Sequence, residues 1–216
     1  MAKVALFHTS VATLPLMKDL VEKYMPDIDV MHIIEEAMIK EVMVNKGVST
    51  NISSRILSYV KAAESAGCEL FMTACSSIGL AVEQCQPFTD MSVSRIDTAM
   101  IKKALESGHK ISVLATVATT MAPTVEYVER MAKESRMTPE IETLLMPKAF
   151  EALLKGDMET HDQIVKTGLD RSLTNSDVVV LAQASMARVI PKGFTSPVPV
   201  LTSPELGIQY LASQLK

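Results

Sequence analysis

The sequence contains Lys3-Val-Ala-Leu-Phe-His-Thr-Ser-Val-Ala-Thr13, and 107 residues later it contains Lys110-Ile-Ser-Val-Leu-Ala-Thr-Val-Ala-Thr-Thr120. A second pair aligns at an offset of 108 residues: Leu70-Phe-Met-Thr-Ala-Cys-Ser-Ser77 with Val178-Val-Val-Leu-Ala-Gln-Ala-Ser185. Each stretch is an apolar run that breaks into small and hydroxyl-bearing residues, which is typical of a buried parallel strand ending at a functional loop. Because the two offsets agree to within one residue, we predict two similar halves with Cys75 in one and Gln183 in the other.

Strand-like apolar runs alternate with helical patterns along the chain, which predicts βαβ units and an α/β fold with mostly parallel sheets. The expected strands are 4–7, 28–33, 70–74, 91–96, 110–115, 142–146, 178–182 and 198–201. The expected helices are 14–24, 53–66, 98–106, 121–134, 150–154, 162–173 and a last one from Ser203. We expect two pseudo-symmetric halves, 1–97 with the C-terminal helix 203–216, and 98–202, with the active site in the cleft between them.

Composition excludes several classes of protein. The chain has 216 residues, of which 48% are hydrophobic and 21% charged, an ordinary globular balance. A net charge of −4 argues against a nucleic-acid partner, because no basic stripe supplies phosphate contacts. The sequence has no apolar run of about 18 residues, so we expect no membrane span. The N-terminal segment lacks the longer apolar stretch of a secretory signal, so we expect a cytoplasmic protein.

The cysteines and histidines do not predict a disulfide or a metal site. Three cysteines, an odd number, form no CxxC pair, and the four histidines show no ligand spacing with them. His8 ends the first expected strand, where it can serve as an acid, a base or an orienting group, or be a structural histidine. His32 is expected near the cleft rim, and His109 and His161 on the surface.

Cys75 is the candidate for chemistry among the cysteines. It follows a strand and precedes Ser76-Ser-Ile-Gly-Leu80, an expected helix start. Backbone N–H groups at a helix N-terminus lower the pKa of a thiol and bind anions. Such a thiol can take up or give a proton near neutral pH. The alternative is a buried, inert cysteine, for which Cys68 and Cys85 are better candidates.

Hydroxyl groups gather where the expected strands end. The candidate ligand-binding residues are Thr9, Ser10, Ser76, Ser77, Thr116, Thr119, Thr120, Ala184 and Ser185. Ligands of open parallel sheets bind at the carboxyl ends of the strands, and hydroxyl and N–H groups there suit a carboxylate or a phosphate. Ordinary helix capping explains one or two of these residues, but not the whole set. Arg188 is the one cation expected near these ends, which favours a small carboxylate over a phosphate.

These features together resemble the aspartate/glutamate/hydantoin racemase superfamily over essentially the whole chain. Residues 111–119 are similar to the family's Gly-Val-[Leu/Ile]-[Ala/Gly]-Thr-x-x-Thr segment, and Ala74-Cys-Ser-Ser77 is similar to its first cysteine motif. Phe7-His-Thr9 stands where glutamate racemases carry Phe-Asp-Ser, which implies that His8 occupies the position of an assisting acid. The resemblance implies two halves closing on a small carboxylate, no cofactor, a homodimer, and one cysteine from each half that exchanges the Cα proton.

The chain departs from the family at the second cysteine. The family pattern there is Leu-Gly-Cys-Thr-His, or Gly-Cys-Ala-Gly-Met in hydantoin racemases, whereas this chain has Leu181-Ala-Gln-Ala-Ser-Met-Ala187. Gln183 therefore takes the place of the cysteine, and Ser185 that of the accompanying histidine. An amide donates and accepts hydrogen bonds but does not exchange protons with carbon. Symmetric racemisation by two thiols is therefore not expected.

We expect a cofactor-independent isomerase of the racemase or epimerase type, acting at the α-carbon of an amino acid or related acid. Cys75 would be the proton carrier, His8 or a water the second carrier, and Gln183 would hold a polar group of the substrate or a water. A lyase that decarboxylates a malonate-like acid also fits one cysteine, although arylmalonate decarboxylases of this superfamily keep the cysteine of the other half. Maleate isomerases of the superfamily imply a third use, with Cys75 as nucleophile.

Two non-enzymatic alternatives remain open. The first is a carboxylate-binding protein that kept the pocket and lost the chemistry. The second is a redox-sensing thiol protein, which would need a resolving cysteine near Cys75.

Overall fold

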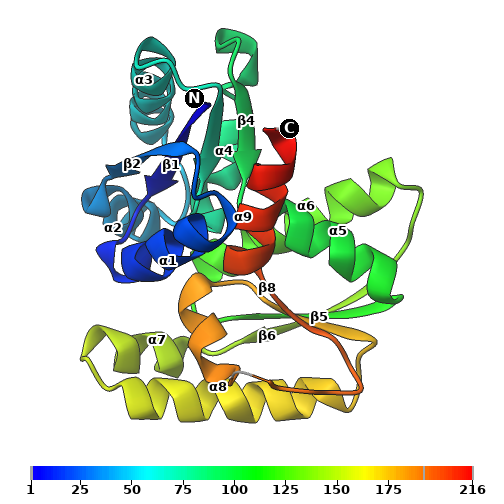
Figure 1. The fold of residues 1–216 in the computed structure, drawn as a ribbon. Coiled ribbons are helices and arrows are strands. Elements are labelled where there is room, and N and C mark those ends of the chain that lie inside the picture. Colours follow the sequence, from blue (N-terminus) through cyan, green and yellow to red (C-terminus); the bar gives the residue numbers. More distant parts are fainter. Residues whose placement is uncertain (1, 192, 216) are drawn as a thin grey trace. The chain divides into compact units, whose positions relative to one another are not determined.

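The computed structural model describes residues 2–191 and 193–215, and it divides into two compact units (Figure 1). The first unit is Met1–Thr98 with Pro204–Lys216, and the second is Ala99–Ser203. Residues 1, 192 and 216, which belong to the predicted halves, lie outside the described residues. Among the helices described, none combines the length and the apolar character needed to cross a bilayer.

The first unit has a four-stranded parallel sheet in the order β2-β1-β3-β4. Its strands are β1 (Lys3–His8), β2 (Asp29–Ile34), β3 (Leu70–Thr73) and β4 (Ser92–Arg95). Its α-helices are α1 (Leu14–Tyr24), α2 (Glu36–Asn45), α3 (Thr50–Ser65), α4 (Gly79–Glu83) and α9 (Ser203–Gln214). Short 3-10 helices are η1 (Val11–Thr13), η2 (Ser76–Ile78) and η3 (Gln86–Phe88).

The second unit has the same sheet order, β6-β5-β7-β8, again with parallel neighbours. Its strands are β5 (Lys110–Ala115), β6 (Glu140–Leu145), β7 (Val178–Leu181) and β8 (Val200–Thr202). Its helices are α5 (Thr98–Ser107), α6 (Ala118–Glu134), α7 (Pro147–Leu154), α8 (Met158–Leu173) and the 3-10 helix η4 (Ala184–Val189).

The two sheets also repeat the same strand register. Val4 of β1 lies opposite Leu70 of β3, and Ile111 of β5 lies opposite Val178 of β7. These pairs are the ones that the sequence repeat superimposes. The prediction of an α/β fold with two similar halves, each built on a parallel sheet, is confirmed.

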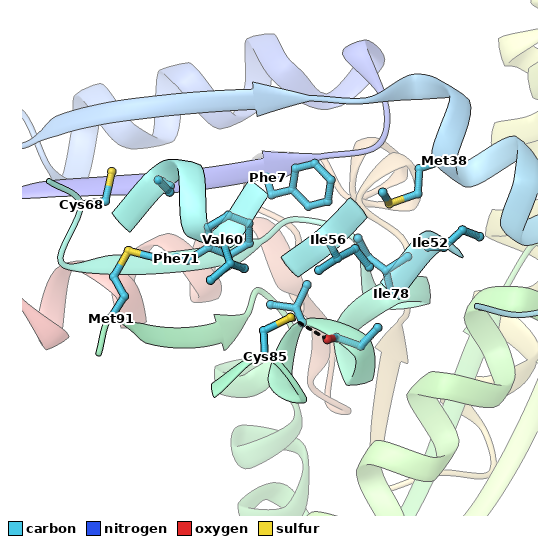
Figure 2. Packing of buried hydrophobic residues seen from close by; sticks show 14 of the residues in the cluster. Phe7, Met38, Ile52, Ile56, Val60, Cys68, Phe71, Ile78, Cys85 and Met91 are labelled. Atoms are coloured by element: carbon cyan, nitrogen blue, oxygen red, sulfur yellow. Dashed lines mark hydrogen bonds between the residues drawn. The ribbon is translucent and has the colours of Figure 1, made fainter. Parts of the chain in front are cut away.

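The central strands β1, β3, β5 and β7 are mostly apolar because helices cover both faces of each sheet. Ala5 and Phe7 of β1 pack into a cluster with residues of α2, α3 and α4, which Figure 2 shows from close by. Val4 and Leu6 point to the other face and pack with residues of α1 and α9. The two faces are therefore filled by alternate residues of one strand.

Several elements differ from the sequence prediction, and helices α7 and α8 begin at Pro147 and Met158 rather than at residues 150 and 162. Helix α2 was not predicted; it buries only Met38 and Val42, so its apolar stripe is narrow. Helix α6 begins at Ala118 rather than at residue 121, so Thr119 and Thr120 lie in its first turn instead of in a loop.

Candidate functional site

Cys75 and Gln183 occupy equivalent positions in the two units. Each stands two residues after a central strand, β3 or β7, and caps the start of a 3-10 helix, η2 or η4. Their backbones are similarly extended, with φ −128° and ψ 110° at Cys75 and φ −125° and ψ 138° at Gln183. The sequence repeat therefore identified two positions with the same local backbone.

Several hydrogen-bond donors act on the Cys75 thiol in the first unit. They are the hydroxyl of Thr9, the backbone N–H groups of Ser77 and Ile78, and the side chain of Ser77, and each acts to lower the pKa of Cys75. The N–H of Ile78 donates to the carbonyl oxygen of Cys75 at 3.3 Å. Because β1 and β3 are neighbours in the sheet, Thr9 and Cys75 follow adjacent strand ends. The loop is held by a bond from the Cys75 N–H to Thr73 Oγ1, at 3.2 Å.

Burial has the larger effect on this thiol. Desolvation raises the pKa of Cys75 above its ordinary value, although the hydrogen bonds from Thr9, Ser77 and Ile78 act to lower it. The predicted donors are thus present, but the prediction of a lowered pKa is wrong. Cys75 is a neutral thiol at pH 7, surrounded by groups that stabilise its thiolate.

His8 lies on the other side of the β1 strand from this sulfur. It shares the face of Val4 and Leu6, and its Nε2 is 3.0 Å from Nδ1 of His32 on β2. His8 is 1% exposed, and its Nδ1 has no hydrogen-bond partner among the described residues. Burial, and then the neighbouring His32, lower the pKa of His8 to about 4. His8 is therefore neutral at pH 7, which argues against the assisting-acid role.

In the second unit, Gln183 is held by Thr116, the first residue after β5. Oε1 of Gln183 accepts from the backbone N–H of Thr116 at 2.5 Å and from its hydroxyl at 3.0 Å. Thr116 is fully buried and Gln183 is half-buried. Both donors of Thr116 are therefore engaged by Gln183 in this structure, and the role of Thr116 towards a ligand stays a prediction.

The remaining candidate residues divide by unit. Ser76 and Ser77 are buried in η2, and Ala184 and Ser185 are half-buried in η4. Thr120 is buried in the first turn of α6, and the neighbouring Thr119 has a buried Oγ1 without a partner in the described part of the chain. Ser10 accepts a bond from the N–H of Ala12 at 3.2 Å, so it is an ordinary cap of η1.

Sequence reasoning missed Arg95 at the carboxyl end of β4. Arg95 is 1% exposed, and its Nε and Nη2 each lie 2.8 Å from a carboxylate oxygen of Asp97. Its Nη1 is 3.6 Å from Oε2 of Glu83 at the end of α4. A Cβ placed on Gly79, the first residue of α4, would lie 2.3 Å from Nε of Arg95. The guanidinium therefore packs directly behind the Cys75 loop.

Two predictions about exposure need correction or completion. His161 is fully buried, not on the surface, and its Nδ1 is 2.8 Å from Oδ1 of Asp162. The expected cation Arg188 contacts that same Oδ1 at 3.2 Å. Cys68 and Cys85 are buried in the hydrophobic core, and Cys85 donates to the carbonyl of Ala81 (Figure 2).

The described residues contain no group of three or more His, Cys, Asp or Glu side chains placed to hold a metal ion. The site residues are instead one thiol, one amide, hydroxyl groups and backbone N–H groups.

Solved structures with a similar fold include three racemases. An aspartate racemase from Picrophilus torridus is 17% identical with a TM-score of 0.70, over 99% of this chain and 95% of that one. A glutamate racemase from Aquifex pyrophilus is 18% identical with a TM-score of 0.65, over 99% and 84%. An allantoin racemase from Klebsiella pneumoniae is 13% identical with a TM-score of 0.67, over 100% and 88%.

A search of curated proteins finds no match. The family model for Asp/Glu/Hydantoin racemase, in contrast, matches residues 7–211, which include the end of β1, all of β3, β5 and β7, and both Cys75 and Gln183. With the duplicated parallel sheets and the equivalent strand ends described above, this match means that the chain belongs to the Asp/Glu/Hydantoin racemase family.

Proposed function

We propose that this protein is a cofactor-independent isomerase of the racemase or epimerase type, with Cys75 as the proton carrier at the α-carbon of a small carboxylate. The observation that carries the proposal is the set of donors on the Cys75 sulfur, from Thr9, Ser77 and Ile78. A structural thiol in an apolar core needs no such donors. A thiol that alternates between its neutral and charged forms does need them, because they offset the desolvation cost of a thiolate at this half-buried position.

In the proposed reaction, the Cys75 thiolate removes the proton from Cα and the electron pair of the C–H bond passes into the carboxylate as an enediolate. Fixed N–H and hydroxyl donors stabilise the charge that develops on the oxygens. The thiol then returns a proton to carbon. Inversion also requires a second carrier that gives a proton to the opposite face of Cα. Because His8 is neutral above about pH 4 and faces the other side of β1, the proposal assigns this step to a water.

A lyase is the second candidate, and the raised pKa of Cys75 favours it. In decarboxylation the C–C bond breaks, CO2 leaves, and the bonding electrons remain on Cα as an enediolate. The neutral thiol then gives its proton to one face of this carbon, and solvent reprotonates the thiolate. This sequence starts from the protonated form of Cys75, which prevails at pH 7, whereas racemisation starts from the thiolate.

Deuterium incorporation from D2O tests the proposal. Aspartate, glutamate, a hydantoin and substituted malonates would be incubated with the wild type, Cys75→Ala and the control Cys68→Ala, whose thiol lies in the core. We expect exchange at Cα to fall by about 100-fold or more in Cys75→Ala and to persist in Cys68→Ala. Inversion identifies an isomerase, and release of CO2 a lyase. Binding without exchange for every acid would instead indicate a carboxylate-binding protein.

We also propose that the protein acts as a homodimer, as the family resemblance implies. Sedimentation velocity of the purified chain gives the answer directly: a dimer mass supports the proposal, and a monomer at all concentrations contradicts it.

A further inference from the structure

The orientation of the Gln183 amide follows from the chemistry of its neighbour. The backbone N–H of Thr116 can only donate, and the side-chain atom 2.5 Å from it must therefore be an acceptor, the oxygen Oε1. The Thr116 hydroxyl adds a second bond to the same oxygen at 3.0 Å. Both lone pairs of Oε1 are thus used, and the amide cannot flip without placing two donors against each other.

The nitrogen of the same amide remains available. Nε2 carries two N–H donors, and no partner for them is found in the described parts of the chain, 2–191 and 193–215. Because Gln183 is half-buried, a ligand can reach this nitrogen, while the two bonds to Oε1 restrict its position. The position equivalent to Cys75 therefore presents a fixed hydrogen-bond donor that does not exchange a proton with carbon.

The surrounding residues suit an anionic acceptor. The residues that follow β5 and β7, 116–120 and 182–185, include hydroxyl groups and this amide but no Asp or Glu. Thr119 contributes a hydroxyl that has no partner among the described residues, and it lies in the first turn of α6, a helix of 17 residues whose N-terminus carries partial positive charge. No acidic side chain in these segments would repel a carboxylate.

We propose that Gln183 is a substrate-binding residue, whose amide nitrogen donates a hydrogen bond to a carboxylate oxygen of the ligand, and that it is not a proton carrier. The proposal rests on the proposed function only for the ligand class, a small carboxylate. It gives the two equivalent strand-end positions different chemistry: Cys75 carries a proton that can be transferred, and Gln183 carries a hydrogen-bond donor for an anion.

Exchange of the amide for a carboxylate separates binding from folding. In Gln183→Glu one oxygen can still accept both bonds from Thr116, while the second becomes a negatively charged acceptor in place of the N–H donors. The matched control is Gln163→Glu, which makes the same change of charge at an exposed position of α8. Urea unfolding of both variants checks that each retains the fold.

The test uses protein labelled with 15N in its glutamine side chains. The Gln183 cross-peaks are those missing from the Gln183→Glu spectrum, and they would be followed during titration with acetate, malonate and both enantiomers of aspartate and glutamate. We expect at least one acid to shift these peaks to saturation. Its Kd should rise about ten- to hundredfold in Gln183→Glu, the loss of a bond to a charged group, and stay the same in Gln163→Glu.

The outcomes distinguish this inference from the proposed function. Shifted Gln183 peaks without deuterium exchange would leave the inference standing and contradict an enzymatic role. Deuterium exchange with equal Kd values in Gln183→Glu and Gln163→Glu would overturn the inference alone. If none of the acids shifts the Gln183 peaks, the assignment of a carboxylate ligand to Gln183 is wrong. If Gln183→Glu does not fold, the Gln183 peaks can be identified instead as those that shift in Thr116→Val. The titration of the wild type then decides whether an acid binds at Gln183.

Discussion

Thr9 is the side chain through which the end of β1 influences the chemistry of Cys75. Its hydroxyl donates to the sulfur and opposes the effect of burial on the pKa of Cys75. A hydrogen bond to a charged acceptor favours the charged form, so its removal disfavours the thiolate. The side chain is 5% exposed, so water does not readily take its place.

We predict that Thr9→Val raises the pKa of Cys75 further, because the variant keeps the shape of the side chain and loses the donor. Alkylation of Cys75 by iodoacetamide at pH 8, measured on the peptide that contains it, should become roughly three- to tenfold slower. Thr9→Ser retains a hydroxyl and should react at close to the wild-type rate. Equal rates in Thr9→Val and the wild type would show that Thr9 does not bond the thiolate.

His8 leads to a second prediction, on how the free energy of unfolding depends on pH. Its pKa of about 4 in the folded protein lies below the ordinary value of 6.5, so between these values the unfolded chain binds more protons. The free energy of unfolding must therefore fall as the pH falls from 6.5 towards 4. His32, whose pKa is also lowered, by burial and by Lys18, acts in the same direction.

Urea unfolding at pH 7.5 and at pH 5 measures this effect. Between pH 7.5 and pH 5, we expect the free energy of unfolding of the wild type to fall by about 2 kcal/mol more than that of His8→Gln. Only the wild type has the imidazole of His8, which binds a proton more weakly in the folded state than in the unfolded chain. The difference should be absent between pH 7.5 and pH 9. A wild type and a His8→Gln variant with parallel pH profiles would mean that His8 titrates normally.

The sequence could predict the position of a candidate residue where that position depends on the strand period alone. Cys75 and Gln183 follow apolar runs, and the repeat aligns them without any knowledge of packing. The pKa of Cys75 and the burial of His161 depend on groups from other elements, so sequence could not predict either. Arg95 was missed because its strand is short and because its contacts with Glu83 and Asp97 depend on the packing of α4 against β4.

At the scale of elements, the position of α4 depends on Gly79. Gly79 has a helical conformation, φ −54° and ψ −48°, so backbone strain does not require glycine there. In a helix, alanine would normally be more favourable by about 1 kcal/mol. Here a Cβ would lie 2.3 Å from Nε and 2.5 Å from Cζ of the buried Arg95, which is itself held by Asp97. Packing therefore reverses the usual preference.

We predict that Gly79→Ala lowers the free energy of unfolding by about 1–3 kcal/mol, the usual cost of overpacking. The variant should also change the reactivity of Cys75, because displacement of α4 disturbs the Ser77 and Ile78 donors. Gly47→Ala is the control: nothing lies within 4 Å of its added Cβ, and its stability should change little. A Gly79→Ala protein more stable than the wild type would refute the packing of Arg95 behind this loop.

The missed and misplaced elements have a common cause. Helix α2 has no side-chain cap and buries two residues, so its sequence differs little from that of an exposed loop. The start of α6 lacks a capping side chain as well, which is why the threonines before Met121 resembled a strand end. In both cases tertiary packing, rather than a local signal, determines where the helix begins.

At the scale of the whole molecule, the chain leaves the first unit near Thr98 and returns to it at Pro204. The returning helix α9 completes the core of that unit, where Ile208 and Leu211 pack with Val4 and Leu6 of β1. Contact there is close, since a Cβ on Gly207 would lie 2.5 Å from the carbonyl oxygen of Ile96. The last residues of the chain therefore stabilise the strand that precedes Thr9.

We predict that Leu211→Ala and Leu169→Ala, each in the core of one unit, have separate effects on amide hydrogen exchange. Leu211 is fully buried against β1, so its truncation should lower protection in β1 and β3, at a cost of about 2–5 kcal/mol. Leu169, 3% exposed, packs with Leu114 and Val179, and its truncation should act on β5 and β7. Deuterium uptake measured on peptides from all four strands distinguishes the two patterns. Equal loss of protection in both sheets from either variant would show that the two units open as one cooperative body, and that the Cys75 half and the Gln183 half cannot be destabilised independently.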